Sequence, residues 1–220
     1  MENKVTTILF DKKITHDEIG AFRGAILTLL PDDPVLHNHG EEMILYRYPK
    51  VQYKTCNGKA CIIGMNEGAD ILERELHLGD ELTLRIGRRI CQFTITDKTT
   101  TYFNPGNSRA EGYDYKITDW LPLNQENHIA YTQMKSLHDR IGLLDRILTA
   151  SILRLLQGFN HFIDYRCEAF ITDIISSEVI KYKGVEMLAF DITIHTNIRL
   201  PENFGLGKGS SRGHGIITEI

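Results

Sequence analysis

Residues 51–63 read VQYKTCNGKACII, and this stretch holds the clearest local fold signal in the sequence. Two strand-like runs, Val51–Cys56 and Lys59–Ile63, flank the dipeptide Asn57–Gly58. An Asn-Gly pair between two such runs is the strongest short-range signal for a β-hairpin, because both residues tolerate the backbone of a two-residue turn. We therefore predict two antiparallel strands joined by this turn.

The elements on either side of the hairpin give the first half of the chain a recognisable order. Thr15 and Glu18 have the spacing of a capping box, which predicts the start of a helix that ends near Pro31. Together with the other strand and helix patterns, the order is strand, helix, strand, strand, helix, strand, as in a ferredoxin-like domain. The other predicted elements are the strand Val5–Phe10, the helix Asn66–His77 and the strands Leu82–Ile86 and Ile90–Ile95.

The second half of the chain follows a related order. Residues 97–112, DKTTTYFNPGNSRAEG, are polar and rich in turn formers, which predicts a linker or long loop. A strand, one long helical pattern from Asn124 to Gly158 and two further strands then lead to a glycine-rich segment in place of a second helix. The predicted strands are Tyr113–Asp119, Phe170–Tyr182, Val185–His195 and Ile216–Ile220.

These orders predict an α+β fold of tandem ferredoxin-like (RRM-like) domains. The first domain spans residues 1–98, a linker spans 99–112, and the second domain spans 113–220. The second domain is degenerate, because a glycine-rich loop at residues 203–215 takes the place of its last helix.

Composition places the chain among ordinary soluble globular proteins, with 42% hydrophobic and 25% charged residues. No apolar run approaches the ~20 residues of a membrane span. The four cysteines are scattered without a CxxC pair, so we expect reduced thiols and a cytoplasmic protein. The net charge of −4 leaves room for local basic clusters, of which three stand out: Arg47, Lys50 and Lys54; Arg85, Arg88 and Arg89; Arg199, Lys208 and Arg212.

His37 and His39 are the strongest candidates for proton transfer. They follow a predicted helix and loop, and in an extended segment they would point to the same side. Imidazole can take or give a proton near neutral pH. The alternatives are a metal site with Glu41 or Glu42, or ordinary surface histidines. Basic and aromatic residues follow within about ten positions, as an exposed strand that binds nucleic acid requires: Tyr46, Arg47, Tyr48, Lys50, Tyr53 and Lys54.

The C-terminal segment GLGKGSSRGHG, residues 205–215, combines closely spaced glycines with Lys208 and Arg212. Such a loop can bring backbone N–H groups and cations to a phosphate, while the alternative is a flexible surface loop. Two other glycine motifs are excluded. Only five residues follow, too few for a dinucleotide-binding βαβ unit, and Lys208 is followed by Gly209 where a Walker loop needs Ser or Thr.

Taken together, these features resemble the CRISPR-associated endoribonucleases that cut repeat RNA into guide RNAs. The likeness covers nearly the whole chain. It includes the GLGKGSSRGHG tail, LHNHG followed by YRYPKVQYK, the helix segment Phe22–Ala25 and the segment Ile63–Gly68 after the hairpin. The run from His37 to Lys54 is similar to one subfamily, in which a histidine pair in this loop serves catalysis.

The resemblance implies metal-independent cleavage, in which the 2′-hydroxyl beside the scissile phosphate attacks it and leaves a 2′,3′-cyclic phosphate and a 5′-hydroxyl. It implies His37 and His39 as base and acid, with Tyr46 or Tyr48 assisting, and no metal or other cofactor. The partners implied are CRISPR repeat RNA, other CRISPR effector subunits and a second copy of the chain, and no membrane. The RNA-binding residues implied are Arg47, Lys50, Lys54, Gly205, Gly207, Lys208, Gly209, Ser210, Ser211 and Arg212.

Two other functions remain open at this point. One is a non-catalytic RNA-binding subunit that shelters or presents the guide RNA. The other is a metal-dependent hydrolase that uses His37, His39 and a carboxylate such as Glu41.

Overall fold

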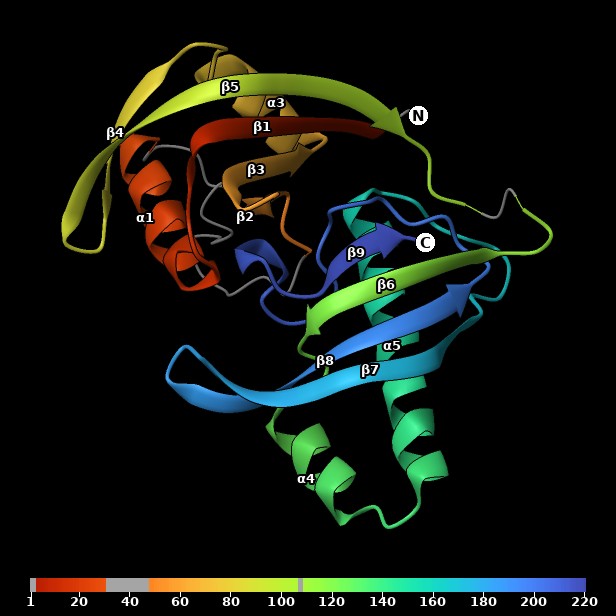
Figure 1. Cartoon of the computed structure of the whole chain (residues 1–220). Coiled ribbons are helices and arrows are strands. Elements are labelled where there is room, and N and C mark those ends of the chain that lie inside the picture. The colour runs from red at the N-terminus through yellow and green to blue at the C-terminus, as the bar shows by residue number, and fades with distance from the viewer. Residues whose placement is uncertain (1–2, 31–47, 107–108) are drawn as a thin grey trace, which may run out of the picture. The chain divides into compact units, whose positions relative to one another are not determined.

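The computed structural model describes residues 3–30, 48–106 and 109–220. The chain divides into two compact units, Met1–Asn104 with Ser211–Gly213, and Pro105–Ser210 with His214–Ile220. Each unit is built around one antiparallel sheet, as Figure 1 shows. Across the described residues, no helix is long and apolar enough to cross a membrane.

The first unit has the predicted ferredoxin-like order with one additional strand. Its sheet has the order β2-β3-β1-β5-β4, in which β4 extends the ferredoxin-like arrangement by pairing with β5. The elements are β1 (Asn3–Lys13), the 3₁₀ turn η1 (His16–Glu18), α1 (Ile19–Leu29), β2 (Val51–Cys56), β3 (Lys59–Met65), α3 (Glu67–Glu75), β4 (Glu81–Ile86) and β5 (Arg89–Phe103).

Two local signals in the sequence are confirmed. The β2–β3 hairpin turns at Asn57 and Gly58, whose φ angles of 52° and 75° both lie in the left-handed region. The backbone N–H of Thr15 donates to Glu18 Oε2 over 3.0 Å, as the capping box requires. This cap opens η1, and α1 follows directly.

Helices α1 and α3 cover the same face of the first sheet. Lys4, Thr6 and Phe10 are on one face of β1, because side chains alternate along a strand. Glu73 of α3 contacts Lys4 and Thr6, and Phe22 of α1 packs edge-on against Phe10 with ring centroids 5.3 Å apart. The shared face is therefore the core of the unit.

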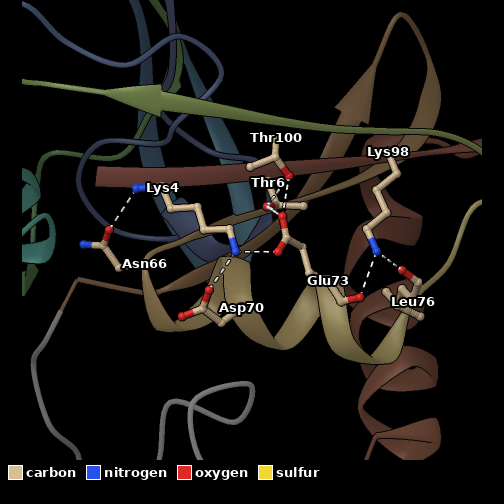
Figure 2. Close-up of polar contacts among 8 residues, drawn as sticks. All are labelled: Lys4, Thr6, Asn66, Asp70, Glu73, Leu76, Lys98 and Thr100. Carbon is tan, nitrogen blue, oxygen red and sulfur yellow. Dashed lines mark hydrogen bonds and ion pairs between the residues drawn. The ribbon is translucent and has the colours of Figure 1, made fainter. Parts of the chain in front are cut away.

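A network of polar side chains fixes α3 to the sheet (Figure 2). The Lys4 ammonium donates to Asp70 Oδ1 over 2.8 Å and to the Glu73 carboxylate. The hydroxyls of Thr6 and Thr100 donate to Glu73 Oε1 over 3.3 and 2.5 Å. The hydrogen bond from Lys4 is the main cause that lowers the pKa of Glu73 below its ordinary value. The carboxylate therefore stays charged and holds helix and sheet together.

Lys98 of β5 caps the C-terminal end of α3. Lys98 Nζ donates to the backbone carbonyls of Glu73 and Leu76 over 2.8 and 2.7 Å. These carbonyls are acceptors at the end of a helix, where a positive charge also interacts favourably with the helix dipole. Figure 2 shows the ammonium lying between them.

The predicted linker is shorter than expected, because β5 continues to Phe103. Residues 97–103 had suggested a loop, but they pair with β1 in a regular register from Leu9↔Asp97 to Asn3↔Phe103. Threonines are common in strands because their branched side chains suit a pleated surface. The polar composition of this segment reflects exposure of the strand and not a lack of structure.

The second unit also has the ferredoxin-like strand order, β7-β8-β6-β9. Its last strand follows the glycine-rich loop in place of a full helix, as predicted. The elements are β6 (Tyr113–Trp120), α4 (Gln125–Gln133), α5 (Leu137–Gly158), β7 (Ala169–Tyr182), β8 (Val185–Thr196) and β9 (Ile216–Glu219), while the short turn η2 (Ser210–Arg212) lies in the glycine-rich loop.

The single long helix predicted from Asn124 to Gly158 is wrong, because two helices occupy this range. Met134 and Ser136 have extended backbone, and Ser136 is the N-cap of α5. Helix α4 has no buried residue, whereas the apolar face of α5 is buried in the unit. The helical periodicity in the sequence therefore belongs to α5 alone.

Strand β7 is irregular at two points. Its pairing with β8 skips Thr172 and Ile175, slightly before the predicted irregularity at Ser176 and Ser177. Beyond these bulges the β7–β8 hairpin is regular up to the predicted turn at Lys183 and Gly184.

Candidate nucleic-acid interface

Four of the predicted site residues lie outside the described residues. These are His37, His39, Tyr46 and Arg47, and the carboxylates considered as metal ligands, Glu41 and Glu42, lie in the same range. From that segment the structure describes Tyr48, Lys50 and Lys54, and it also describes the whole glycine-rich loop.

The expectation that β2 displays its cations on an exposed strand is wrong. Gln52, Tyr53 and Lys54 are all buried, and the Lys54 side chain is only 1% exposed. Burial lowers the pKa of Lys54 from its ordinary value to about 8, because an apolar surrounding disfavours the charged form. Lys54 therefore cannot present its ammonium to an RNA strand at the surface, and we withdraw it from the proposed RNA contacts.

A chain of hydrogen bonds connects Lys54 with Tyr48. Lys54 Nζ donates to Gln52 Oε1 over 2.9 Å, and Gln52 Nε2 donates to the Tyr48 hydroxyl over 2.9 Å. Burial raises the pKa of Tyr48 well above its ordinary value, so its hydroxyl stays protonated. Tyr48 can therefore act as a hydrogen-bond donor and not as a base.

Lys50 is held by the first turn of α3. Its ammonium lies 3.1 Å from Glu67 Oε2 and is only partly accessible. Its backbone carbonyl accepts from the N–H of Met65 over 2.9 Å, which fixes the chain as it enters β2. The ion pair with Glu67 offsets part of the charge that Lys50 would offer to a phosphate.

The part of the glycine-rich loop that belongs to the second unit is packed closely against that unit and is not a loose surface segment. Leu206 N donates to the Gly215 carbonyl over 2.8 Å, and Gly215 N donates to the Asp119 carbonyl over 3.0 Å. Lys208 N donates to the Leu121 carbonyl over 3.3 Å. These three N–H groups already donate to backbone carbonyls of the protein, so they are not available to bind a phosphate.

Gly215 shows why the loop needs glycine. Its φ of 69° is in the left-handed region, and a Cβ there would lie 2.0 Å from the backbone oxygen of Leu206. Any side chain would separate two segments that hydrogen bonds hold together. The glycine content thus has a packing cause in addition to any role in binding.

Lys208 is the exposed cation of the loop. It lies between Gly207 and Gly209, whose φ angles of 76° and 77° are both in the left-handed region. Among the described residues, none forms an ion pair with its ammonium. The loop therefore presents a solvated positive charge on a fixed backbone.

Two aromatic contacts of this loop were not predicted. A Cβ on Gly207 would lie 2.9 Å from Trp120 Nε1, so the indole packs directly against the loop backbone. Tyr182 packs edge-on against buried His214 with ring centroids 5.1 Å apart. Trp120 is the only tryptophan in the sequence, yet nothing in its neighbours indicates this contact.

Three residues of the loop belong to the first unit. In Ser211–Gly213, the Gly213 carbonyl lies 3.2 Å from His16 Nε2, and a Cβ on Gly213 would meet the side chain of Ile19. Arg212 and Ser211 are partly exposed, whereas Ser210 is buried. Of the predicted loop contacts, Lys208 is exposed, whereas Gly207, Gly209, Ser211 and Arg212 are partly exposed.

Arg89 of the middle basic cluster pairs with Glu18, while Arg85 and Arg88 are exposed. No group of three or more His, Cys, Asp or Glu side chains in the described ranges is arranged to hold a metal ion.

The sequence matches two family models that together span nearly the whole chain. Residues 1–101 match the Cas6b N-terminal domain, and residues 107–220 match the Cas6b C-terminal domain. The chain belongs to the Cas6b family. The resemblance to CRISPR-associated endoribonucleases is thereby confirmed at the level of the family.

Solved structures show the same fold over their full length. A crystal structure of Cas6b aligns with a TM-score of 0.87 at 22% identity, and a CRISPR RNA processing endoribonuclease Cas6b aligns with a TM-score of 0.76 at 21% identity. Both alignments cover 100% of each chain. An uncharacterised protein of Methanocaldococcus jannaschii, MJ0978, is 25% identical over 104 residues, which are 47% of this chain and 69% of that protein. The Cas6b fold neighbours confirm the α+β fold with two ferredoxin-like sheets.

Proposed function

We propose that this chain is an endoribonuclease that cuts CRISPR repeat RNA into guide RNAs. The observation that carries the proposal is the match to Cas6b family models along both halves of the chain. A fold neighbour named as a CRISPR RNA processing endoribonuclease supports the same activity. Repeat RNA is the substrate, and the solvated charge on the glycine-rich loop is suited to its backbone.

The proposed chemistry uses a nucleophile that belongs to the substrate. The 2′-hydroxyl attacks the adjacent phosphorus, the bond to the 5′-oxygen breaks, and the products carry a 2′,3′-cyclic phosphate and a 5′-hydroxyl. The protein then has to supply a base for the 2′-hydroxyl, an acid for the leaving oxygen and stabilisation of the phosphate charge. His37 and His39 are proposed as base and acid, and each well-placed group of this kind contributes roughly 10²–10⁴-fold.

Tyrosine and cation contacts complete the proposal. Tyr48, whose hydroxyl stays protonated, would donate to a phosphate oxygen, and Tyr46 is the second candidate for this task. Lys208 and Arg212 would hold backbone phosphates, Arg212 by bidentate contact. Arg47 and Lys50 are weaker candidates, since Lys50 already pairs with Glu67.

The test uses repeat RNA transcribed from a CRISPR array of the source genome. In the presence of EDTA we expect a single cut that leaves a cyclic phosphate and a 5′-hydroxyl. A 2′-deoxy residue before the cut should abolish cleavage, because it removes the nucleophile. Cleavage that needs a divalent ion would instead support a metal-dependent hydrolase.

Histidine variants separate an enzyme from a binding subunit. His37→Ala with His39→Ala should abolish cleavage and leave RNA affinity largely intact. His128→Ala is the matched control, because His128 is an exposed histidine on α4, which has no buried residue. Unchanged processing in the double variant would contradict the catalytic role and favour a non-catalytic RNA-binding subunit.

A further inference from the structure

The sheet of the second unit has one buried face and one face that is open to solvent. Tyr115 and Ile117 of β6 and Ile192 and Ile194 of β8 are fully buried on the first face. Side chains alternate along a strand, so the residues between them lie on the second face, which we call the open face. The open face includes Phe170 and Thr172 of β7, Thr193 and His195 of β8, Asp114 and Lys116 of β6, and Thr218 of β9. All of them are partly or fully exposed.

One row across the open face carries an exposed aromatic ring. Phe170 is directly opposite His195, and their ring centroids lie 5.3 Å apart with the ring planes tilted by 37°. In the same row, His195 is also directly opposite Asp114. Phe170 is 47% exposed, although complete burial of such a ring would be favourable. The fold therefore holds an aromatic surface in solvent instead of using it in the core.

Two further contacts fix the imidazole beside this ring. Asp114 Oδ1 lies 2.8 Å from His195 Nδ1, and a carboxylate can only accept a hydrogen bond, so Nδ1 carries the proton. A Cβ on Gly112, whose φ is 76°, would lie only 2.6 Å from His195 Nε2, so glycine lets the backbone approach the second nitrogen closely. His195 is thus a positioning residue that supports the ring of Phe170.

The next row of the open face provides a cation and hydroxyl groups. Lys116 is directly opposite Thr193 on β8 and Thr218 on β9, so its cross-strand neighbours carry no charge. The hydroxyls of Thr172 and Thr193 lie 2.8 Å apart and share a hydrogen bond. Asp114, the acidic neighbour of Lys116 on this face of β6, is already paired within the first row. An aromatic ring, a cation and hydroxyls on an exposed sheet are groups suited to single-stranded RNA.

We propose that the open face of the second sheet binds a single-stranded segment of the repeat RNA, with one unpaired base stacked on Phe170. This inference rests on the proposed function for the identity of the RNA. The base lies against the exposed part of the ring, and Lys116 in the next row contacts a neighbouring phosphate. Every base has a face that can stack, so the site selects an unpaired base and not a particular sequence. The contact contributes to affinity and not to the chemical step.

The test measures the affinity of the full chain for repeat RNA with a 2′-deoxy residue before the cut, which should prevent cleavage. Phe170→Leu keeps an apolar side chain and removes the aromatic face. It should weaken binding about fivefold or more, the lower end of the contribution of one stacked base. Phe170→Tyr retains the aromatic face and should bind as the parent chain does. Phe162→Ala is the matched control and should not change affinity, because Phe162 is an 81% exposed phenylalanine of the same unit outside the open face.

Abasic RNA identifies the stacked base without altering the protein. Repeat RNAs with a single abasic position should lose affinity for the parent chain where that position is the stacked one. The same abasic position should cause no further loss in Phe170→Leu, since both changes remove one contact. If no position shows this coupling, Phe170 does not stack a base and the proposal is overturned.

The outcomes separate this inference from the proposed function. Equal affinity of the parent chain and Phe170→Leu, with a parent chain that cuts repeat RNA, would overturn the open-face contact alone. A parent chain that neither binds nor cuts repeat RNA would overturn both. At saturating RNA, Phe170→Leu should cut cleavable repeat RNA at the parent's rate, and a lower rate would contradict a role in affinity alone.

Discussion

The β2–β3 hairpin and the glycine-rich loop both carry a lysine that the sequence predicted to contact RNA, but they differ in where they place that charge. Both are short segments with lysine among residues suited to RNA contact. The hairpin places Lys54 inside the protein, where it bonds to Gln52. The loop places Lys208 in solvent, while its backbone is fixed by hydrogen bonds. A basic residue in a sequence thus indicates a charge, and only the packing around it decides which surface, if any, that charge serves.

The largest expected effect concerns the fixed backbone of the loop. Gly215→Ala should destabilise the chain by roughly 2–4 kcal/mol, since it combines an unfavourable positive φ with a clash against Leu206. Urea unfolding followed by tryptophan fluorescence measures the effect, because Trp120 is the only tryptophan and lies in the same unit.

Gly142→Ala is the matched control for this substitution. Gly142 lies within α5, and a Cβ there would meet nothing within 4 Å. Alanine should therefore stabilise the helix by about 0.5–1 kcal/mol. Equal effects of the two substitutions would mean that the loop is loose, and the contrast with the hairpin would then fail.

The next effect concerns the buried ammonium of the hairpin. The pKa of Lys54 is about 8 in the folded chain and 10.5 in its ordinary state, so the unfolded chain binds more protons between these values. The free energy of unfolding should rise with pH across this window, by roughly 3 kcal/mol from this group, and the gain should be lost as pH falls through 8.

Lys54→Met should remove this rise, which urea unfolding of reduced protein at several pH values would measure. Lys12→Met is the control, because the Lys12 side chain is 52% exposed. If the free energy of unfolding depends on pH in the same way in the Lys54 variant and the parent chain, the ammonium of Lys54 is not buried.

A third, smaller effect tests a lysine whose charge is paired. Glu73→Gln should lower the free energy of unfolding at pH 7 by roughly 1–2 kcal/mol, since it weakens the charged hydrogen bond with Lys4. The folded pKa of Glu73 is depressed, so its contribution is present above its ordinary value of 4.5 and is lost as pH falls below it. Circular dichroism during urea unfolding should therefore show the difference between the two proteins shrinking as pH falls through the folded pKa of Glu73, below 4.5. A difference that persists there would show that the charge of Glu73 is not the cause.

The parts of the fold that were predicted correctly rest on signals local to the chain. Asn57–Gly58 defines a hairpin by its own conformational preference, and Thr15 with Glu18 caps a helix through contacts three residues apart. The strand and helix order then led to the ferredoxin-like arrangement, because few topologies connect such elements with short loops.

The errors concern features that depend on residues far apart in sequence. Residues 97–103 appeared to be a loop, yet they become a strand because β1 provides a partner. Lys54 looked exposed, yet the fold buries it. The packing of Trp120 against Gly207 likewise depends on two segments that only the fold brings together. His37 and His39 lie outside the described residues, so their role stays a prediction from the sequence.

The most direct measurement compares Lys208→Ala and Lys54→Met for the salt dependence of repeat-RNA binding, using the His37→Ala, His39→Ala background to prevent cleavage. We expect Lys208→Ala to weaken binding by about 1 kcal/mol and to reduce the slope of log affinity against log salt by roughly 0.7–0.9, the value of one phosphate contact. Lys54→Met should leave that slope unchanged. The reverse result, a lower slope for Lys54→Met and none for Lys208→Ala, would contradict the assignment of the RNA-contacting charge to the glycine-rich loop.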